Sequence, residues 1–237
     1  MRTLPLLSAA IVAASLSTAA LAADPVTDAM SAAYAPYRTA LFRTNGQSQP
    51  EALQAMAKTR EGWREFTARF GTRPPAPYDR DARFGEALAQ VAAIFEKADA
   101  QIRERNLPAA HETLEAARDV MAELRRRNGV VTFSDHMNAY HAEMEHLLDV
   151  GSKLADSPDG LMPLMARAGV LKYLAGRLRT QAPQDHAADA EFVRALEGVE
   201  QTVAAHEAAL LAQDRPRVRD ALSNLKRPYS RLFLKFG

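Results

Sequence analysis

The chain contains no cysteine, which excludes disulfides, iron–sulfur clusters, thiolate metal sites and haem attached through a Cys-x-x-Cys-His motif. It also lacks an excess of charge of either sign, because 30 basic residues face 29 acidic ones in a chain of 237. This balance gives no electrostatic reason to bind nucleic acid or an anionic membrane surface. Long apolar runs are missing beyond the first two dozen residues, so no membrane span is predicted in the rest of the chain.

The N-terminus carries the one long apolar stretch, and its pattern is that of a secretion signal. Arg2 supplies a positive charge, residues 4–21 are largely apolar, and Ala20-Leu21-Ala22 fits the small-x-small rule for signal cleavage. We therefore predict that residues 1–22 are removed and that the protein is periplasmic. Loss of Arg2 leaves 29 basic against 29 acidic residues, so the mature chain is neutral.

Helix signals dominate the remaining sequence, whereas strand signals are scarce. Ala, Leu, Glu, Arg and Gln are abundant, and apolar residues recur with a period near 3.6. Glycine, asparagine and proline divide the chain, for example at Asn45-Gly46, at 74–77 and at Asn128-Gly129. The predicted helices lie near 25–44, 49–70, 80–105, 108–127, 134–155, 158–180, 187–213 and 216–235.

The second half of the chain repeats the first. Pro158 follows Pro50 by 108 residues, and the same offset aligns the segment 82–88 with 190–196, including a Phe and a Leu at matching places. Self-similarity over this length indicates two copies of one structural unit.

Four helices with short loops in each copy favour an up-down-up-down bundle. We therefore predict an all-α protein of two tandem four-helix bundles after a cleaved signal peptide, with the first unit at 23–129 and the second at 130–237. One continuous eight-helix array is the alternative, and helices could also be exchanged between the units.

Each predicted unit resembles the soluble periplasmic b-type cytochromes. In that family a four-helix bundle holds haem between a Met early in the first helix and a His near the end of the fourth. Met30 and Met137 match the early position, and Lys226-Arg227-Pro228-Tyr229-Ser230 resembles the closing segment of the family. The resemblance implies the bundle fold. Because Ala122 and Ser230 stand where the haem His would be, it does not imply a Met/His haem site.

The most unusual stretch lies at the start of the second unit, where three of the six histidines fall within eleven residues. Met137, His141 and Met144 are spaced i, i+4 and i+7, so we expect them to share an inward helix face. His136 borders that face, and His186 lies in the loop expected beside the same end of the bundle. Thioether and imidazole donors together suit copper, above all Cu(I).

A structural role for the same residues stays open, because Met commonly fills cores and an inward His often only bonds a neighbour. No Ser–His–Asp constellation or phosphate loop accompanies them. We therefore predict a non-enzymatic periplasmic binding protein that sequesters or transfers copper. The alternatives are a b-type haem electron carrier with another axial pair and a ligand-free interaction module. Basic runs at 125–127 and near the C-terminus suggest an acidic protein partner.

Overall fold

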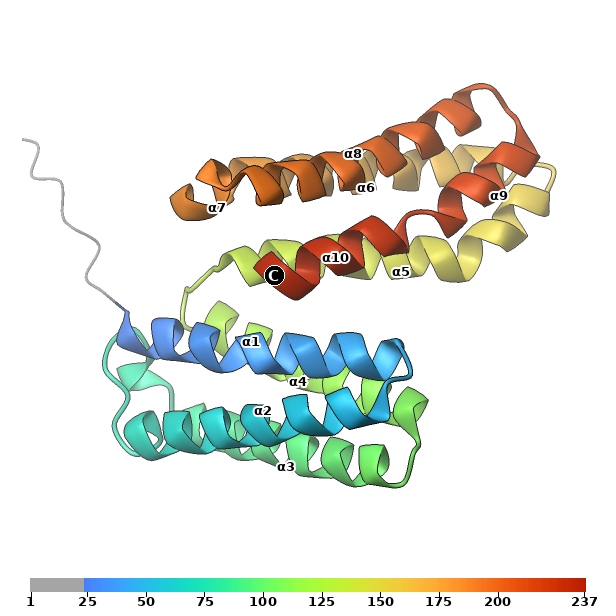
Figure 1. Ribbon diagram of the computed structural model, residues 1–237. Coiled ribbons are helices and arrows are strands. Elements are labelled where there is room, and N and C mark those ends of the chain that lie inside the picture. Colours follow the sequence, from blue (N-terminus) through green and yellow to red (C-terminus); the bar gives the residue numbers. More distant parts are fainter. Residues whose placement is uncertain (1–23) are drawn as a thin grey trace, which may run out of the picture.

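The computed structural model describes residues 24–237, so the predicted signal peptide lies outside the described residues. Within them no strand occurs and every regular element is helical (Figure 1), which confirms the all-α prediction. The N-terminal half contains α1 (Pro25–Asn45), α2 (Gln49–Phe70), the 3₁₀ turn η1 (Tyr78–Arg80), α3 (Phe84–Arg103) and α4 (Leu107–Arg127). The C-terminal half contains α5 (Phe133–Asp156), α6 (Leu161–Thr180), α7 (Gln184–Ala188), α8 (Ala190–Leu211), α9 (Arg215–Ser223) and α10 (Lys226–Phe236).

The helices begin at residues that satisfy their free N–H groups. The Asp24 carboxylate accepts hydrogen bonds from the backbone N–H groups of Val26 and Thr27, at 3.2 and 3.0 Å. Thr132 and Asp135 form a capping box at the start of α5. Proline occupies the first turn of α1, α2, α4 and α9, where its missing N–H costs no hydrogen bond.

In the N-terminal half α1 and α3 each pack against both α2 and α4, so the four helices surround one core. Aromatic side chains fill much of it and find partners for their polar atoms. The Tyr37 hydroxyl donates to the carbonyl oxygen of Leu114 at 2.6 Å, and the Trp63 indole N–H donates to that of Leu88 at 3.1 Å.

In the C-terminal half α5 packs on α6 and α9, α6 packs on α8, and α8 packs on α9 and α10. Its core is mainly aliphatic and includes Met137, Met144, Leu147, Leu171, Leu196 and Val199. No helix in the described part of the chain combines the length and apolarity needed to cross a membrane.

The predicted helix over 216–235 is wrong in one respect, because the structure breaks it at Asn224 and Leu225 into α9 and α10. Pro228 explains the break: it has no N–H for the carbonyl of Asn224, and its ring crowds that carbonyl. The equivalent residue of the N-terminal half is Val120, and α4 runs through it without interruption. The break lets α10 lie against α1, so it helps to join the two halves (Figure 1).

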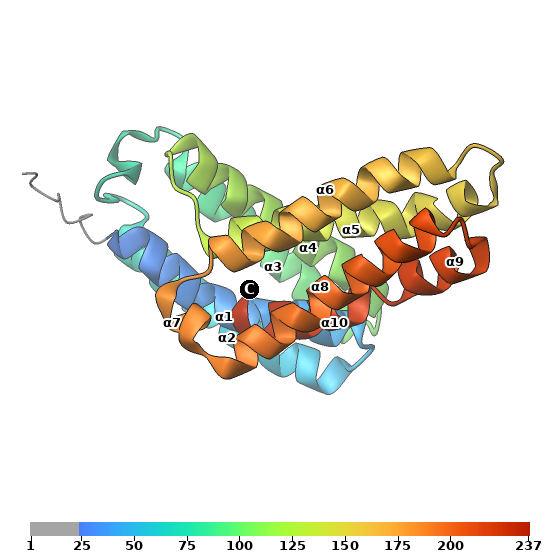
Figure 2. The ribbon, with the colours of Figure 1, turned by 90° about the horizontal axis from the view of Figure 1, so that it is seen from above.

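The halves meet where α1 and α4 face α5 and α10, while α6 and α8 form the layer farthest from the N-terminal half (Figure 1). Seen from above, the helices of the two halves cross instead of running in parallel (Figure 2). Arg125 of α4, only 3% exposed, pairs with Asp135 of α5 through Nε and Oδ2 at 3.0 Å. The carboxylate that caps α5 therefore also ties that helix to the other half.

Candidate functional site

A cavity of about 40 Å³ lies between the two halves, where α1, α4, α5 and α10 come together. This volume admits a few water molecules or an ion, but not an organic cofactor. Residues from all four helices line it: Leu41, Phe42, Asn45, His111, Glu115, Arg118, His141, Lys226, Tyr229, Ser230 and Phe233.

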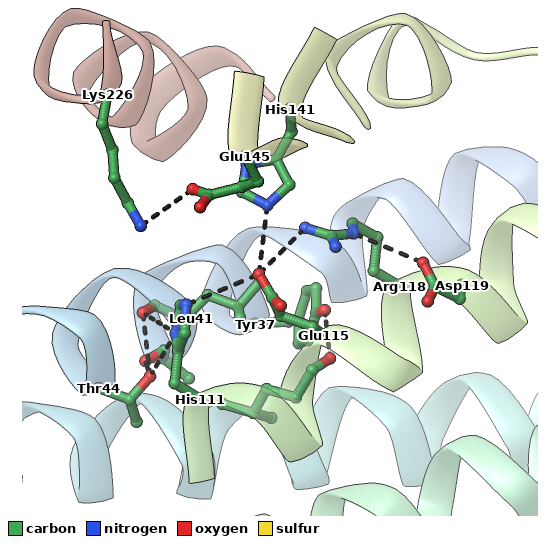
Figure 3. Close-up of polar contacts among 12 residues, drawn as sticks. Tyr37, Leu41, Thr44, His111, Glu115, Arg118, Asp119, His141, Glu145 and Lys226 are labelled. Atoms are coloured by element: carbon green, nitrogen blue, oxygen red, sulfur yellow. Dashed lines mark hydrogen bonds and ion pairs between the residues drawn. The ribbon is translucent and has the colours of Figure 1, made fainter. Parts of the chain in front are cut away.

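Two imidazoles in this cavity face one carboxylate oxygen (Figure 3). Nε2 of His141 lies 3.2 Å from Oε1 of Glu115, and Nε2 of His111 lies 3.7 Å from the same oxygen. His111 and Glu115 are one helical turn apart on α4, whereas His141 comes from α5. The cluster therefore forms only when the two halves are packed together.

A second contact indicates which ring nitrogen of His111 carries the hydrogen. Its Nδ1 lies 3.1 Å from the carbonyl oxygen of Leu41, which can only accept a hydrogen bond. Nδ1 also lies 3.2 Å from the Thr44 hydroxyl oxygen, whose own hydrogen can go to the carbonyl oxygen of Ala40 at 2.9 Å. We therefore assign the hydrogen to Nδ1, because this tautomer satisfies all of these contacts. In the neutral imidazole, Nε2 then turns a lone pair, and no hydrogen, toward Glu115.

The charge states in the cluster follow from its burial and its partners. The hydrogen bond from His141, supported by the positive charge of Arg118 and opposed by burial, lowers the pKa of Glu115 to about 2. Burial lowers the pKa of His111 below its usual value of 6.5, although Glu115 opposes that shift. At neutral pH Glu115 is therefore ionised and His111 is neutral.

Two cationic side chains border the cluster. Nη1 of Arg118 lies 3.6 Å from Oε1 of Glu115, and Nζ of Lys226 lies 2.9 Å from Oε1 of Glu145 (Figure 3). Arg118 also pairs with Asp119, with Nε 3.7 Å from Oδ1, but of the two cations it is the one that forms an ion pair with Glu115.

The structure separates the residues predicted from the Met/His pattern. The side chains of Met137 and Met144 are fully buried in the core of the C-terminal half, while His141 lines the cavity between the halves. On a helix, a residue four positions after another points about 40° away from it. This rotation is enough for His141 to face α4 while Met137 faces the core.

The other two predicted donors lie elsewhere. The His186 ring packs against those of Phe133, Phe192 and Phe236, with centroids 5.4 to 5.6 Å apart, and it lines a separate groove. His136 is half-buried, and burial together with the charge of Arg177 lowers its pKa. The imidazoles of His141 and His186 thus do not share one cavity.

Sequence reasoning does not assign His111 and Glu115 to a site, because a His and a Glu four residues apart on one helix are typical of a solvated ion pair. One available signal was their spacing with Arg118. The three residues follow i, i+4 and i+7, so a polar stripe runs along one face of α4. Such a stripe indicates a polar contact surface, but not the element that covers it.

Each residue of the basic run at the end of α4 has an acidic partner within the chain. Arg125 pairs with Asp135, Arg126 with Glu123 at 2.7 Å, and Arg127 with Asp81 at 2.6 Å. This run therefore requires no external acidic partner to balance its charge.

Comparison of the chain with protein families, with curated proteins and with solved structures finds no match. The resemblance to b-type cytochromes therefore stays a prediction.

Proposed function

We propose that the protein is a non-enzymatic, periplasmic binding protein of two tandem four-helix bundles, and that it binds a transition-metal ion between them. The ligands are the two imidazoles and the carboxylate of the cluster formed by His111, Glu115 and His141. The observation that carries the proposal is that Nε2 of His111, to which we assign no hydrogen, lies 3.7 Å from an oxygen of the Glu115 carboxylate.

Two electron-rich atoms that face each other repel, and a cation between them removes the repulsion. Around a tetrahedral ion with bonds of about 2.1 Å, neighbouring ligand atoms are about 3.4 Å apart. The two Nε2–Oε1 distances, 3.2 and 3.7 Å, lie on either side of this value. The hydrogen bond from Nδ1 of His111 to a carbonyl oxygen is also the support that metal-binding histidines commonly have.

The donor set favours Cu²⁺ or Zn²⁺, which accept imidazole and carboxylate, and Cu²⁺ binds such ligands more tightly. The copper hypothesis is thus kept with a changed donor set, because the thioethers of Met137 and Met144 lie in the hydrophobic core. The positive charge of Arg118 opposes a bound cation and favours moderate affinity. This suits sequestration or transfer better than permanent retention.

Metal uptake requires a local rearrangement. As they stand, no three His, Cys, Asp or Glu side chains within residues 24–237 form a group that could hold a metal ion. The hydrogen bond between His141 and Glu115 must open, and the hydrogen on Nε2 of His141 must move to Nδ1, so that Nε2 can offer its lone pair to the ion. Because protons compete with a metal ion for imidazole and carboxylate ligands, binding is expected to weaken as the pH falls.

A haem carrier fits less well. The interface cavity is far smaller than a haem. The Ser230 hydroxyl, at the position of the missing haem His, donates to the carbonyl oxygen of Lys226 at 2.9 Å.

Calorimetric titration of the exported protein with Cu²⁺ tests the proposal, with electron paramagnetic resonance to count nitrogen ligands. We expect one ion per chain, and the double variant His111→Ala/His141→Ala to bind it more than about 100-fold more weakly. His146→Ala is the matched control, because His146 lies on α5 but is exposed and outside the cavity.

Unchanged copper affinity in the double histidine variant would contradict the proposed site. Loss of binding in Met137→Leu/Met144→Leu, with helicity retained, would instead restore the thioether site. N-terminal sequencing of the exported protein tests the compartment separately, with Ala23 or Asp24 expected as the first residue.

A further inference from the structure

Helix α6 carries apolar and small residues on the face that it turns to solvent. Met162 is 81% exposed and Tyr173 is 62% exposed, which is unusual for such large apolar side chains. The exposed positions recur at alternating intervals of four and three residues, the spacing of a coiled-coil seam. We name them the α6 seam: Met162, Ala166, Gly169, Tyr173 and Gly176, with exposed Val170 beside them.

The opposite face of α6 is apolar as well, because it contributes to the core of its own half. Leu164, Leu171 and Leu178 on that face are fully buried. Helix α6 therefore has two opposite apolar faces, and a broad apolar face of a helix is normally covered. Within residues 24–237 nothing covers the α6 seam, which belongs to the layer farthest from the N-terminal half (Figure 1).

The internal repeat supplies a comparison for this face. Helix α2 is the counterpart of α6 at an offset of 108 residues, and its outer face is solvated in the ordinary way. The residues equivalent to the α6 seam are Gln54, Lys58, Glu61, Glu65 and Ala68. The packing of four helices therefore does not require an apolar outer face at this position.

The charges of α6 indicate what could cover the seam. The helix contains four basic residues and no acidic one. Three of the four pair with carboxylates of α5 and α8 while their own side chains stay 45–63% exposed, and such partly solvated pairs contribute little stability. The fourth, Arg177, has no salt bridge within residues 24–237, and its guanidinium lies 3.4 Å from the Tyr173 hydroxyl.

A second copy of the chain fits this surface poorly. It would place two helices with four basic residues each along one seam. An acidic partner, in contrast, would complement the basic residues.

The two glycines add a steric feature. A Cβ atom placed on Gly169 or on Gly176 would meet no other atom within 4 Å. The seam is therefore open above both residues, seven positions apart, and large side chains of a partner helix could lie there as knobs.

We propose that the α6 seam is a docking surface for an amphipathic helix of an acidic partner protein. That helix would carry large apolar residues at heptad spacing, with Asp or Glu beside them. The surface is distinct from the metal cluster and does not depend on it.

A synthetic peptide of four heptads, with Leu at positions a and d and Glu at e and g, probes this surface by calorimetry on the full mature protein. We expect it to bind, and the same peptide with Lys in place of Glu to bind at least about tenfold more weakly. Gly169→Glu/Tyr173→Glu installs the residues found at the equivalent α2 positions. It is expected to weaken binding of the acidic peptide by at least about tenfold.

Two further variants and a stability measurement show whether a loss of peptide binding is caused by misfolding. Met162→Glu lies at the other end of the seam and should weaken binding in the same way. Glu61→Gln/Glu65→Gln on α2 is the matched control and should leave binding unchanged. The midpoint of thermal unfolding should not fall in Gly169→Glu/Tyr173→Glu, because both positions are exposed and the glycine is replaced by a better helix former.

Four outcomes would overturn the proposal. These are absence of binding by the acidic peptide, equal binding of the Lys peptide, and unchanged binding in both seam variants. The fourth is that the acidic peptide does not bind, while the protein self-associates in sedimentation velocity or binds phosphatidylglycerol vesicles, and the seam variants abolish that self-association or vesicle binding. It would assign the seam to a second copy or to a membrane surface.

Discussion

Helices α2 and α6 occupy equivalent positions in the two halves, yet their side chains differ on both faces. On the inner face, Trp63, Phe66 and Phe70 of α2 form a chain of ring contacts with centroids 5.0 and 5.4 Å apart. The equivalent residues of α6 are Leu171, Leu174 and Leu178. On the outer face, charged residues of α2 correspond to the apolar seam of α6.

The two kinds of difference have different physical meanings. Exchange of aromatic for aliphatic residues on the inner face keeps that face apolar, as burial in a four-helix core requires. Exchange of charged for apolar residues on the outer face brings no benefit to folding, because solvent covers both kinds of residue there. The inner face is thus explained by the fold, whereas the outer face of α6 is not, and this difference is the basis of the proposed docking surface.

The largest expected effect concerns a position that is charged in one half and apolar in the other. Arg125 is buried and pairs with Asp135, while its counterpart in the C-terminal half is Phe233. Asp135→Ala leaves the guanidinium buried without a partner and removes the cap of α5. We expect the free energy of unfolding in urea to fall by about 3 kcal/mol. Glu123→Ala, which breaks the exposed pair with Arg126, should leave it unchanged.

The aromatic core of the N-terminal half gives the next largest effect. Trp63→Leu installs the residue found at the equivalent position of α6. It leaves a cavity and removes the hydrogen bond to the carbonyl oxygen of Leu88. Urea unfolding should show a loss of about 2–3 kcal/mol. The volume-conserving change Leu171→Met should cost less than about 1.5 kcal/mol. A similar loss of unfolding free energy in both variants would mean that the two cores tolerate substitution equally well.

Acid should destabilise the C-terminal half through His206, whose counterpart in the N-terminal half is Ala98. His206 is fully buried, neither ring nitrogen has a partner, and burial lowers its pKa to about 4. Because the unfolded chain binds a proton near pH 6.5, stability is lost as the pH falls from about 6.5 toward 4. The loss should reach about 2 kcal/mol at pH 5 relative to pH 8.

Urea unfolding of His206→Leu at both pH values isolates this contribution. The variant should lose about 2 kcal/mol less than the wild type between pH 8 and pH 5. An equal loss in both proteins would show that other groups cause the acid sensitivity.

The smallest expected effect on stability comes from two glycines whose backbone conformations differ. Gly129 follows α4 with φ at 70°, in the left-handed region, so Gly129→Ala should cost about 1 kcal/mol. Gly169 is helical and has open space around it, so Gly169→Ala should stabilise the protein by about 0.5–1 kcal/mol. Thermal unfolding measures both, and shifts of the same sign would contradict the assignment.

Most helix ends were predictable because their signals are local. Asn45-Gly46 and Asn128-Gly129 end α1 and α4 within a residue or two of the prediction. The break between α9 and α10 was missed although Pro228 was visible, since a proline near a helix start and a proline that breaks a helix look alike in a sequence.

The candidate site was predictable only in part. His141 stood out by its place among Met and His residues, but Glu115, the residue it contacts, precedes it by 26 positions and belongs to the other half. His111 and Glu115 have the spacing of a surface ion pair, and the polar stripe that they form with Arg118 does not reveal which element covers it.

The sequence by itself determined that the chain is helical, where most of its helices begin and end, and that its second half repeats the first. These properties depend on the residue periodicity and on the capping residues of single segments. The tertiary structure decided that His141 meets Glu115 between the halves, that His186 packs among phenylalanine rings, and that the α6 seam faces outward. Periodicity specifies the direction of a side chain around its own helix axis, whereas the residue that it meets depends on how the helices cross and pack.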